Sequence, residues 1–148
     1  MTPRLLVINP GSTSTKIAVY AGEEPLFVET IRHDDADLGR FAQVMDQEDY
    51  RRKLILTALA KHDLSVADLT AIIGRGGLMR PIPGGVYRVG PQMLFDLRSC
   101  RFGTHASNLG AILAHDLATS AGIPSFIADP VVVDEMAPLA RYSGHPDI

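Results

Sequence analysis

The apolar positions at the start of the chain predict three strands in succession. Residues 5–8 form an unbroken apolar run, as expected for a strand that is buried on both faces. Residues 16–20 and 26–31 are two further runs rich in strand-forming residues, and short turn segments separate the three. Connections this short favour an antiparallel meander.

Apolar residues then recur at helical spacing. Residues 47–62 are predicted to form a helix, with Asp46 as its N-cap. Four apolar residues of this segment would share one face of the helix: Leu54, Ile55, Ala58 and Leu59. Residues 65–68 have capping-box spacing, which predicts a short helical turn.

The second half of the chain alternates between strands and helices. Strands are predicted at residues 69–74 and 125–128, with a short extended piece at 86–89. Helices are predicted from Pro91 onward and over residues 107–121. This order predicts an α/β fold, in which a mixed sheet begins with the antiparallel meander and is flanked by helices.

Length and composition suit a single domain over residues 1–148. The chain is 46% hydrophobic and 21% charged, as in soluble globular proteins, and no apolar run approaches the roughly 20 residues that cross a membrane. The N-terminus lacks a signal-peptide pattern, and Cys100 has no partner for a disulfide. We therefore expect a cytoplasmic protein without membrane association, in which Cys100 is a small buried residue.

The net charge of −3 hides a division along the chain. Residues 23–49 contain nine acidic residues against two arginines, whereas residues 75–101 contain five arginines against Asp96 alone. Aromatic residues that could stack on bases are sparse and Trp is absent, so no nucleic-acid partner is expected. A site for a small anion suits the arginines better, with a solvated basic face as the alternative for Arg98 and Arg101.

The turn between the first two strands has the composition of a phosphate cradle. Gly11 allows a ligand to approach the backbone, successive amides in such a turn can bind an anion, and Lys16 adds a positive charge. The turn also carries four hydroxyl groups, on Ser12, Thr13, Ser14 and Thr15. No glycine precedes Lys16 and a strand follows it, so the Walker pattern does not fit. The alternative is an ordinary hydroxyl-rich hairpin turn.

Four polar clusters fall at predicted strand ends or in loops. They are residues 9–16, Arg75 with its neighbouring glycines, residues 105–108, and Asp129. Clusters at the mouths of neighbouring strands can converge on one cleft, which is where α/β sheets place their ligands.

Four segments resemble the acetate and butyrate kinases, within the wider sugar kinase, Hsp70 and actin superfamily. In chain order they are VINPGSTSTKIAVY, GRGGLMRPIPGGVYRV, THASNLGAILAHDLA and IADPVVVDEMAPLAR. The form NPGSTSTK is most similar to butyrate kinase. The resemblance extends from about residue 4 to residue 145, and it implies the ribonuclease H-like fold of actin- and Hsp70-type ATPase domains.

The resemblance implies a kinase that transfers the ATP γ-phosphoryl group reversibly to butyrate or a similar short-chain fatty acid, giving an acyl phosphate and ADP. Arg75, His105 and Asp129 match catalytic positions of the family, and Asn9 matches a position near Mg²⁺. The positions that match nucleotide-phosphate contacts lie in the turn: Gly11, Ser12, Thr13, Ser14 and Lys16.

The chemistry of carboxylate phosphorylation suits these residue types. A fatty acid is already ionised near neutral pH, so the transfer needs positioning and charge stabilisation rather than a base. The Arg75 guanidinium can hold a carboxylate or the transferring phosphoryl group through two hydrogen bonds. Asp129 is expected to orient the phosphoryl group, a water or a metal-bound ligand, and a helix cap is the alternative role of His105. The apolar residues near Met79 form either an acyl pocket or part of the core.

Butyrate kinases have a second domain that supplies the adenine cleft, and this sequence ends where that pattern continues. The resemblance thus implies an N-terminal domain without the C-terminal nucleotide-binding domain of the family. We expect this domain to fold alone, to self-associate as a dimer, and to show little turnover. One alternative is a stand-alone domain that binds anions or a partner protein without catalysis; another is a kinase for acetate or branched-chain acids.

Overall fold

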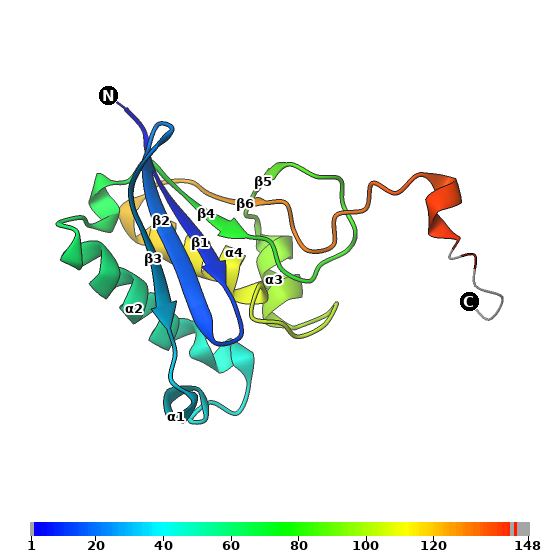
Figure 1. The fold of residues 1–148 in the computed structure, drawn as a ribbon, viewed down its shortest axis with the longest axis horizontal. Helices are drawn as coiled ribbons and strands as arrows, with labels where there is room; N and C mark the ends of the chain where they lie inside the picture. The colour runs from blue at the N-terminus through cyan, green and yellow to red at the C-terminus, as the bar shows by residue number, and fades with distance from the viewer. Residues whose placement is uncertain (1, 143, 145–148) are drawn as a thin grey trace.

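The predicted meander forms one half of the sheet in the computed structural model, which describes residues 2–142 and 144 (Figure 1). Its strands are β1 (Arg4–Pro10), β2 (Ser14–Ala21) and β3 (Glu24–Arg32), paired antiparallel in that order. Strands β1 and β2 extend beyond their apolar runs, which leaves only residues 11–13 as the turn between them.

Three more strands complete a six-stranded mixed sheet in the order β3-β2-β1-β4-β6-β5. Strands β4 (Ala71–Arg75) and β6 (Ser125–Ala128) run parallel to β1, and β5 (Val86–Arg88) pairs antiparallel with β6 at the edge. The carboxyl ends of β1, β4 and β6 therefore meet at one edge of the sheet. The predicted mixed α/β architecture is confirmed.

Two long helices, α2 (Glu48–Lys61) and α4 (Asn108–Ala121), lie on the same face of the sheet (Figure 1). Side chains from the meander and from both helices form one core cluster, which includes Leu6, Ile8, Ile17, Ile55, Leu59, Leu109 and Leu113. The short helix α3 (Pro91–Arg98) packs against α4. The remaining helical segments are α1 (Asp35–Leu38) and the 3₁₀ helices η1 (Val44–Gln47), η2 (Val66–Asp68) and η3 (Pro138–Arg141).

The start of α2 differs from the prediction. Asp46 is not its N-cap, because η1 precedes the helix and the Asp46 carboxylate accepts the Gln43 amide at 3.0 Å. The capping box of η2 is confirmed, with the Ser65 amide donating to the Asp68 carboxylate at 2.8 Å. A cap signal in the sequence thus marks the first helical turn of any kind, whether 3₁₀ or α.

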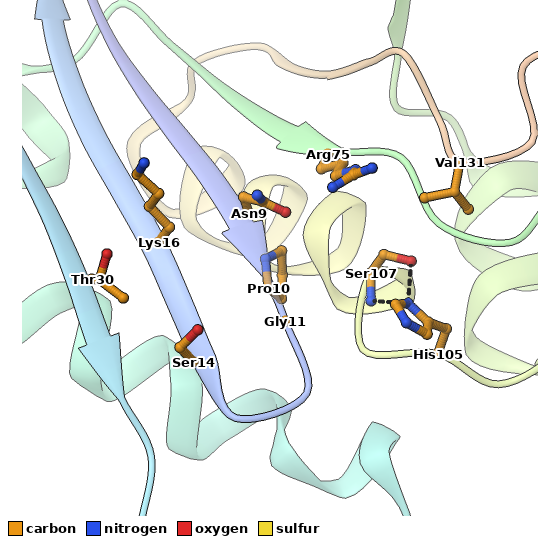
Figure 2. A pocket seen from close by; sticks show the side chains of 10 residues that line it. All are labelled: Asn9, Pro10, Gly11, Ser14, Lys16, Thr30, Arg75, His105, Ser107 and Val131. Carbon is orange, nitrogen blue, oxygen red and sulfur yellow. Dashed lines mark hydrogen bonds between the residues drawn. The ribbon is translucent and has the colours of Figure 1, made fainter.

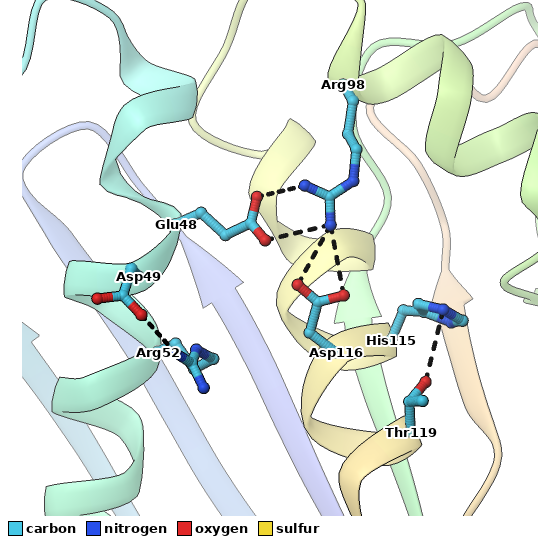
Figure 3. Close-up of polar contacts among 7 residues, drawn as sticks. All are labelled: Glu48, Asp49, Arg52, Arg98, His115, Asp116 and Thr119. Atoms are coloured by element: carbon cyan, nitrogen blue, oxygen red, sulfur yellow. Dashed lines mark hydrogen bonds and ion pairs between the residues drawn. The ribbon is translucent and has the colours of Figure 1, made fainter.

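Arg98 is not part of a free basic face. Its guanidinium, on the last residue of α3, pairs with Glu48 at the start of α2 and with Asp116 in α4 (Figure 3). Burial and a hydrogen bond with Asp116 raise the pKa of Glu48, although the charge of Arg98 opposes that effect. This arginine therefore joins three helices.

Two further expectations concern membranes and cysteine. In the described part of the chain, no helix has both the length and the apolar character that a bilayer span demands. Cys100 is a free thiol, but it is half-buried rather than fully buried, and it adopts a left-handed backbone conformation with φ of 51° just after α3.

Candidate functional site

A row of polar side chains crosses four strands of the sheet. Lys16 of β2 pairs with Asn9 of β1 on one side and with Thr30 of β3 on the other. Across β1, Ile8 pairs with Gly74, which brings Arg75 beside Asn9 at the end of β4. Figure 2 shows Thr30, Lys16, Asn9 and Arg75 in this order. Because directly paired residues point to the same face of a sheet, the strand register itself assembles the row.

A cavity of about 320 Å³ lies over this row. Ten residues line it: Asn9, Pro10, Gly11, Ser14, Lys16, Thr30, Arg75, His105, Ser107 and Val131. Two of them are cationic, several carry hydrogen-bond donors, and this lining contains no acidic residue. Such a composition suits an anion, and the volume lies within the usual range for small-molecule sites.

The hydrogen bonds of His105 determine which of its ring atoms can reach a ligand. Its Nδ1 accepts the backbone amide of Ser107 at 3.1 Å and lies 2.8 Å from the Ser107 hydroxyl (Figure 2). An Nδ1 that accepts an amide carries no proton, so the proton of the neutral ring is on Nε2. His105 therefore caps the start of α4, and it can offer a ligand only an Nε2–H donor while this contact holds.

Asn108 connects the loop after β4 with the loop before α4. It is fully buried, its Oδ1 accepts the Leu78 amide at 2.8 Å, and its Nδ2 donates to the Gly103 carbonyl at 2.9 Å. Both hydrogen-bonding ends of the side chain are thus used to hold loops against the N-terminus of α4. Sequence reasoning grouped Asn108 with His105 but found no role for it.

Sequence reasoning missed a buried arginine beneath the phosphate turn. Arg51 of α2 is 1% exposed, and its guanidinium donates to the Gln47 side chain, to the Thr15 hydroxyl and to carbonyls of the turn. The signal was present, because Arg51 precedes Ile55 by four positions and Ala58 by seven and so extends their buried stripe. Arginine is usually exposed, so the sequence pattern predicts a buried stripe that begins only at Leu54.

His33 completes the buried layer beneath the turn. Its Nε2 lies 2.9 Å from the Thr15 hydroxyl, and its Nδ1 is buried with no hydrogen-bond partner among the described residues. Burial, and then the positive charge of Arg51, lowers the pKa of His33 to about 4. The ring is therefore neutral at physiological pH.

The structure brings together most of the predicted site residues but not all of them. Six line the cavity: Asn9, Gly11, Ser14, Lys16, Arg75 and His105. Ser12 and Thr13 are exposed and lie outside the lining, and the Thr15 hydroxyl is buried against Arg51 and His33. Thr15 therefore cannot donate to a ligand as the sequence suggested.

Asp129 lies near this site but does not line the cavity. It follows Ala128, the residue that pairs with Arg75 across β4 and β6. Its backbone is left-handed, with φ of 37°, and its carboxylate accepts the Gly85 amide at 2.8 Å. The carboxylate is thus used to close the loop before β5.

The pocket fits a phosphate group better than it fits a protein-held metal. Within residues 2–142 and 144, no three His, Cys, Asp or Glu side chains are grouped closely enough to hold a metal ion. Asn9 is one oxygen donor in the cavity, whereas Mg²⁺ is usually held by one or two carboxylates together with substrate phosphates. The lining of this cavity therefore does not form a Mg²⁺ site held by the protein alone.

A second cavity, of about 500 Å³, bears on the expected acyl pocket. Its lining combines five apolar or aromatic residues, Met79, Ile82, Tyr87, Met93 and Phe102, with four polar or charged ones, Arg80, Gln92, Asp96 and Arg101. Met79 is at the same time 7% exposed and part of a core cluster with Ile112 and Ile127. Met79 thus belongs to the core and also lines this cavity, and the acyl pocket stays a prediction.

Comparison with known proteins places the fold. No protein-family model matches the sequence. Among solved structures, the chain is similar to acetate kinase from Porphyromonas gingivalis, with a TM-score of 0.54 and 13% identity over 85% of this chain and 37% of that one. It is also similar to acetate kinase from Entamoeba histolytica, with a TM-score of 0.52 and 14% identity over 97% of this chain and 39% of that one. The chain thus shares the fold of part of these acetate kinases and spans less than two-fifths of their length.

Proposed function

We propose that this chain is the phosphate-loop and substrate part of a kinase that transfers the ATP γ-phosphoryl group to a short-chain carboxylate. The observation that carries the proposal is the pairing of Lys16 and Arg75 on either side of Asn9, in a cavity whose lining contains no acidic residue. Butyrate is the proposed acceptor because the NPGSTSTK segment resembles butyrate kinases. The acetate kinase fold of the chain supports the same reaction class.

The residues divide into two groups by chemistry. Lys16 and the turn at Gly11 and Ser14 suit the phosphates of ATP or ADP. Gly11 has no side chain, so a phosphate can approach the backbone closely, and the Lys16 ammonium group can pair with its negative charge. Arg75 suits the acceptor carboxylate or the transferring phosphoryl group, through the paired donors of its guanidinium. The Nε2–H of His105 adds one neutral donor at the same cavity. No general base is required, because the acceptor is already an anion.

A coupled assay of ADP release tests the proposal. Purified protein is given Mg-ATP with butyrate, propionate, acetate or a branched acid, and the reverse reaction is run from acyl phosphate and ADP. Butyrate-dependent ADP release that is lost on Arg75→Ala supports the proposal. Absence of transfer in both directions, together with absence of ATP binding by calorimetry, would overturn it.

An anion-binding domain without catalysis is the second candidate. It is favoured by the cavity lining, because Lys16 and Arg75 without an acidic neighbour in the lining suit a bound anion whether or not a group is transferred. In that case calorimetry would show binding of pyrophosphate or ADP, while the transfer assay stayed blank. The same preparation also tests the proposed self-association as a dimer, by its sedimentation.

A further inference from the structure

We propose that Arg51 is a positioning residue of the phosphate turn: it holds the turn backbone from inside the protein, and its charge favours an anion on the turn. Arg51 is separated from the cavity by the turn itself and does not line it. The inference rests on the proposed function for the identity of the ligand. The claim that Arg51 holds the turn backbone does not depend on any ligand.

Arg51 holds two carbonyl groups of the turn. Its Nη2 donates to the Ser12 carbonyl at 3.3 Å, and its Nη1 donates to the Ser14 carbonyl at 3.2 Å. The Ser14 carbonyl also accepts the Gly11 amide at 2.7 Å, which closes the turn. A trans peptide unit is planar with its C=O and N–H groups opposed, so the direction of a carbonyl determines that of the next amide. Arg51 therefore helps to determine where the amides of a phosphate cradle point.

The hydroxyl of Thr15 fixes the guanidinium in turn. Arg51 Nη1 donates to Thr15 Oγ1 at 2.9 Å, and the same oxygen lies 2.9 Å from His33 Nε2. On the other side, Nε and Nη2 both donate to the Gln47 side-chain oxygen, at 3.0 and 2.8 Å. With these contacts on both sides, the side chain has little freedom to leave the turn.

The charge of Arg51 is buried and has no acidic partner in these contacts. All five of its hydrogen bonds end on neutral oxygens. Burial lowers the pKa of Arg51 to about 10, so the group is still protonated at neutral pH. A buried charge without a counter-charge is unfavourable, and a phosphate on the far side of Ser14 would provide one. Anion binding and the charge of Arg51 therefore stabilise each other.

Calorimetry with pyrophosphate and with ADP tests whether the charge of Arg51 favours an anion on the turn. Arg51→Met is expected to weaken both affinities by about tenfold or more, which equals about 1.4 kcal/mol, and Arg51→Lys to weaken them less. Arg98→Met is the matched control, because it removes another arginine that joins helices but lies outside the turn. It should lower the melting temperature and leave both affinities within about twofold. Equal affinities for wild type and Arg51→Met would overturn the proposal.

Thr15 provides variants that keep the arginine, in case Arg51→Met does not fold. Thr15→Val removes the hydroxyl that Arg51 contacts and should weaken pyrophosphate binding, whereas Thr15→Ser keeps the hydroxyl and should restore it. A loss of binding that is equal in both variants would point to packing alone and would contradict the proposal.

Amide resonances of the ligand-free protein test whether Arg51 holds the backbone of the turn. Arg51→Lys should shift the amide signals of residues 11–15 while those of β4 and α4 stay in place. Unchanged turn signals would overturn the positioning role. If the wild type binds neither pyrophosphate nor ADP, the proposed phosphate site is disproved. The amide signals then still decide whether Arg51 positions the turn backbone.

Discussion

The backbones of Gly74 and Gly110 touch where strand β4 crosses helix α4. A Cβ atom on Gly74 would lie 2.1 Å from the Gly110 carbonyl oxygen, and a Cβ on Gly110 would lie 2.2 Å from the Arg75 carbonyl oxygen. Neither distance is compatible with a side chain. The contact holds the N-terminal part of α4, with Asn108, against the strand that ends in Arg75.

Replacing Gly110 by alanine tests this contact. Helix propensity alone would make Gly110→Ala stabilising by up to about 1 kcal/mol. Backbone overlap predicts the opposite sign, a loss of about 3 kcal/mol or more in the free energy of unfolding. Gly90→Ala is the control, because nothing lies within 4 Å of the Cβ position and its φ of −124° is open to alanine. Urea denaturation measures both, and a Gly110→Ala variant as stable as wild type would disprove the close contact.

Arg75→Lys tests the paired donors at the end of β4. Lysine keeps the charge but loses the fork of two hydrogen bonds, so in a protein that also contains the nucleotide-binding domain turnover should fall about 10- to 100-fold. The loss should appear mainly in kcat if the contact tightens in the transition state. Arg88→Lys is the matched control, since Arg88 is exposed on β5 and outside the cavity lining. Wild-type kcat in Arg75→Lys would remove Arg75 from the mechanism.

The sequence predicted the elements of this fold well because each has a local signal. The apolar runs of the meander and the helical spacing of α4 reflect the periodicity of apolar residues in strands and helices, which is visible in a single sequence. Strand ends could be placed to within two residues, which located Asn9, Lys16 and Arg75 near them, although all three lie inside β1, β2 and β4. Their convergence follows from strand register, and the sequence suggested it only through the position of polar clusters after strands.

What the sequence could not predict was the direction of individual side chains. Asp129 was placed correctly at the end of β6, but a left-handed backbone directs its carboxylate to the Gly85 amide. The hydroxyl-rich turn predicts Thr15 as a donor to the ligand, yet the alternation of β2 buries it beneath the turn. Arg51 contacts residues 36 to 39 positions earlier in the chain, and no local pattern reports such a contact.

Gly11→Val tests whether the turn binds phosphate through its backbone. A Cβ on Gly11 would lie 3.4 Å from the Ser14 carbonyl oxygen and 3.7 Å from its Oγ, so the fold accepts the added atom. The larger side chain would lie at the cavity and should weaken pyrophosphate binding by about tenfold or more, or about 1.4 kcal/mol. Thr13→Ala is the control, because Thr13 is exposed outside the lining. Equal affinities in both variants would instead favour an ordinary hairpin turn.

The neutral form of His33 makes stability depend on pH. The folded protein holds the pKa of His33 at about 4, below its usual value of 6.5, because burial and the charge of Arg51 disfavour the imidazolium and outweigh the attraction of Asp37. Between these two pH values the unfolded chain binds the proton and the folded chain does not. The stability that depends on a neutral His33 is therefore fully present above about pH 6.5. The free energy of unfolding then falls by at most about 3 kcal/mol as the pH decreases to about 4.

Urea denaturation at several pH values between 4 and 8 measures this effect, with His33→Gln as the comparison. Glutamine can keep a hydrogen bond to the Thr15 hydroxyl, but it does not titrate. The variant should therefore lose less stability than wild type between pH 6.5 and 4, while the other histidines contribute equally to both proteins. Parallel curves would mean that His33 accepts its proton in the folded state as readily as in the unfolded chain, and that the layer beneath the turn is open to water.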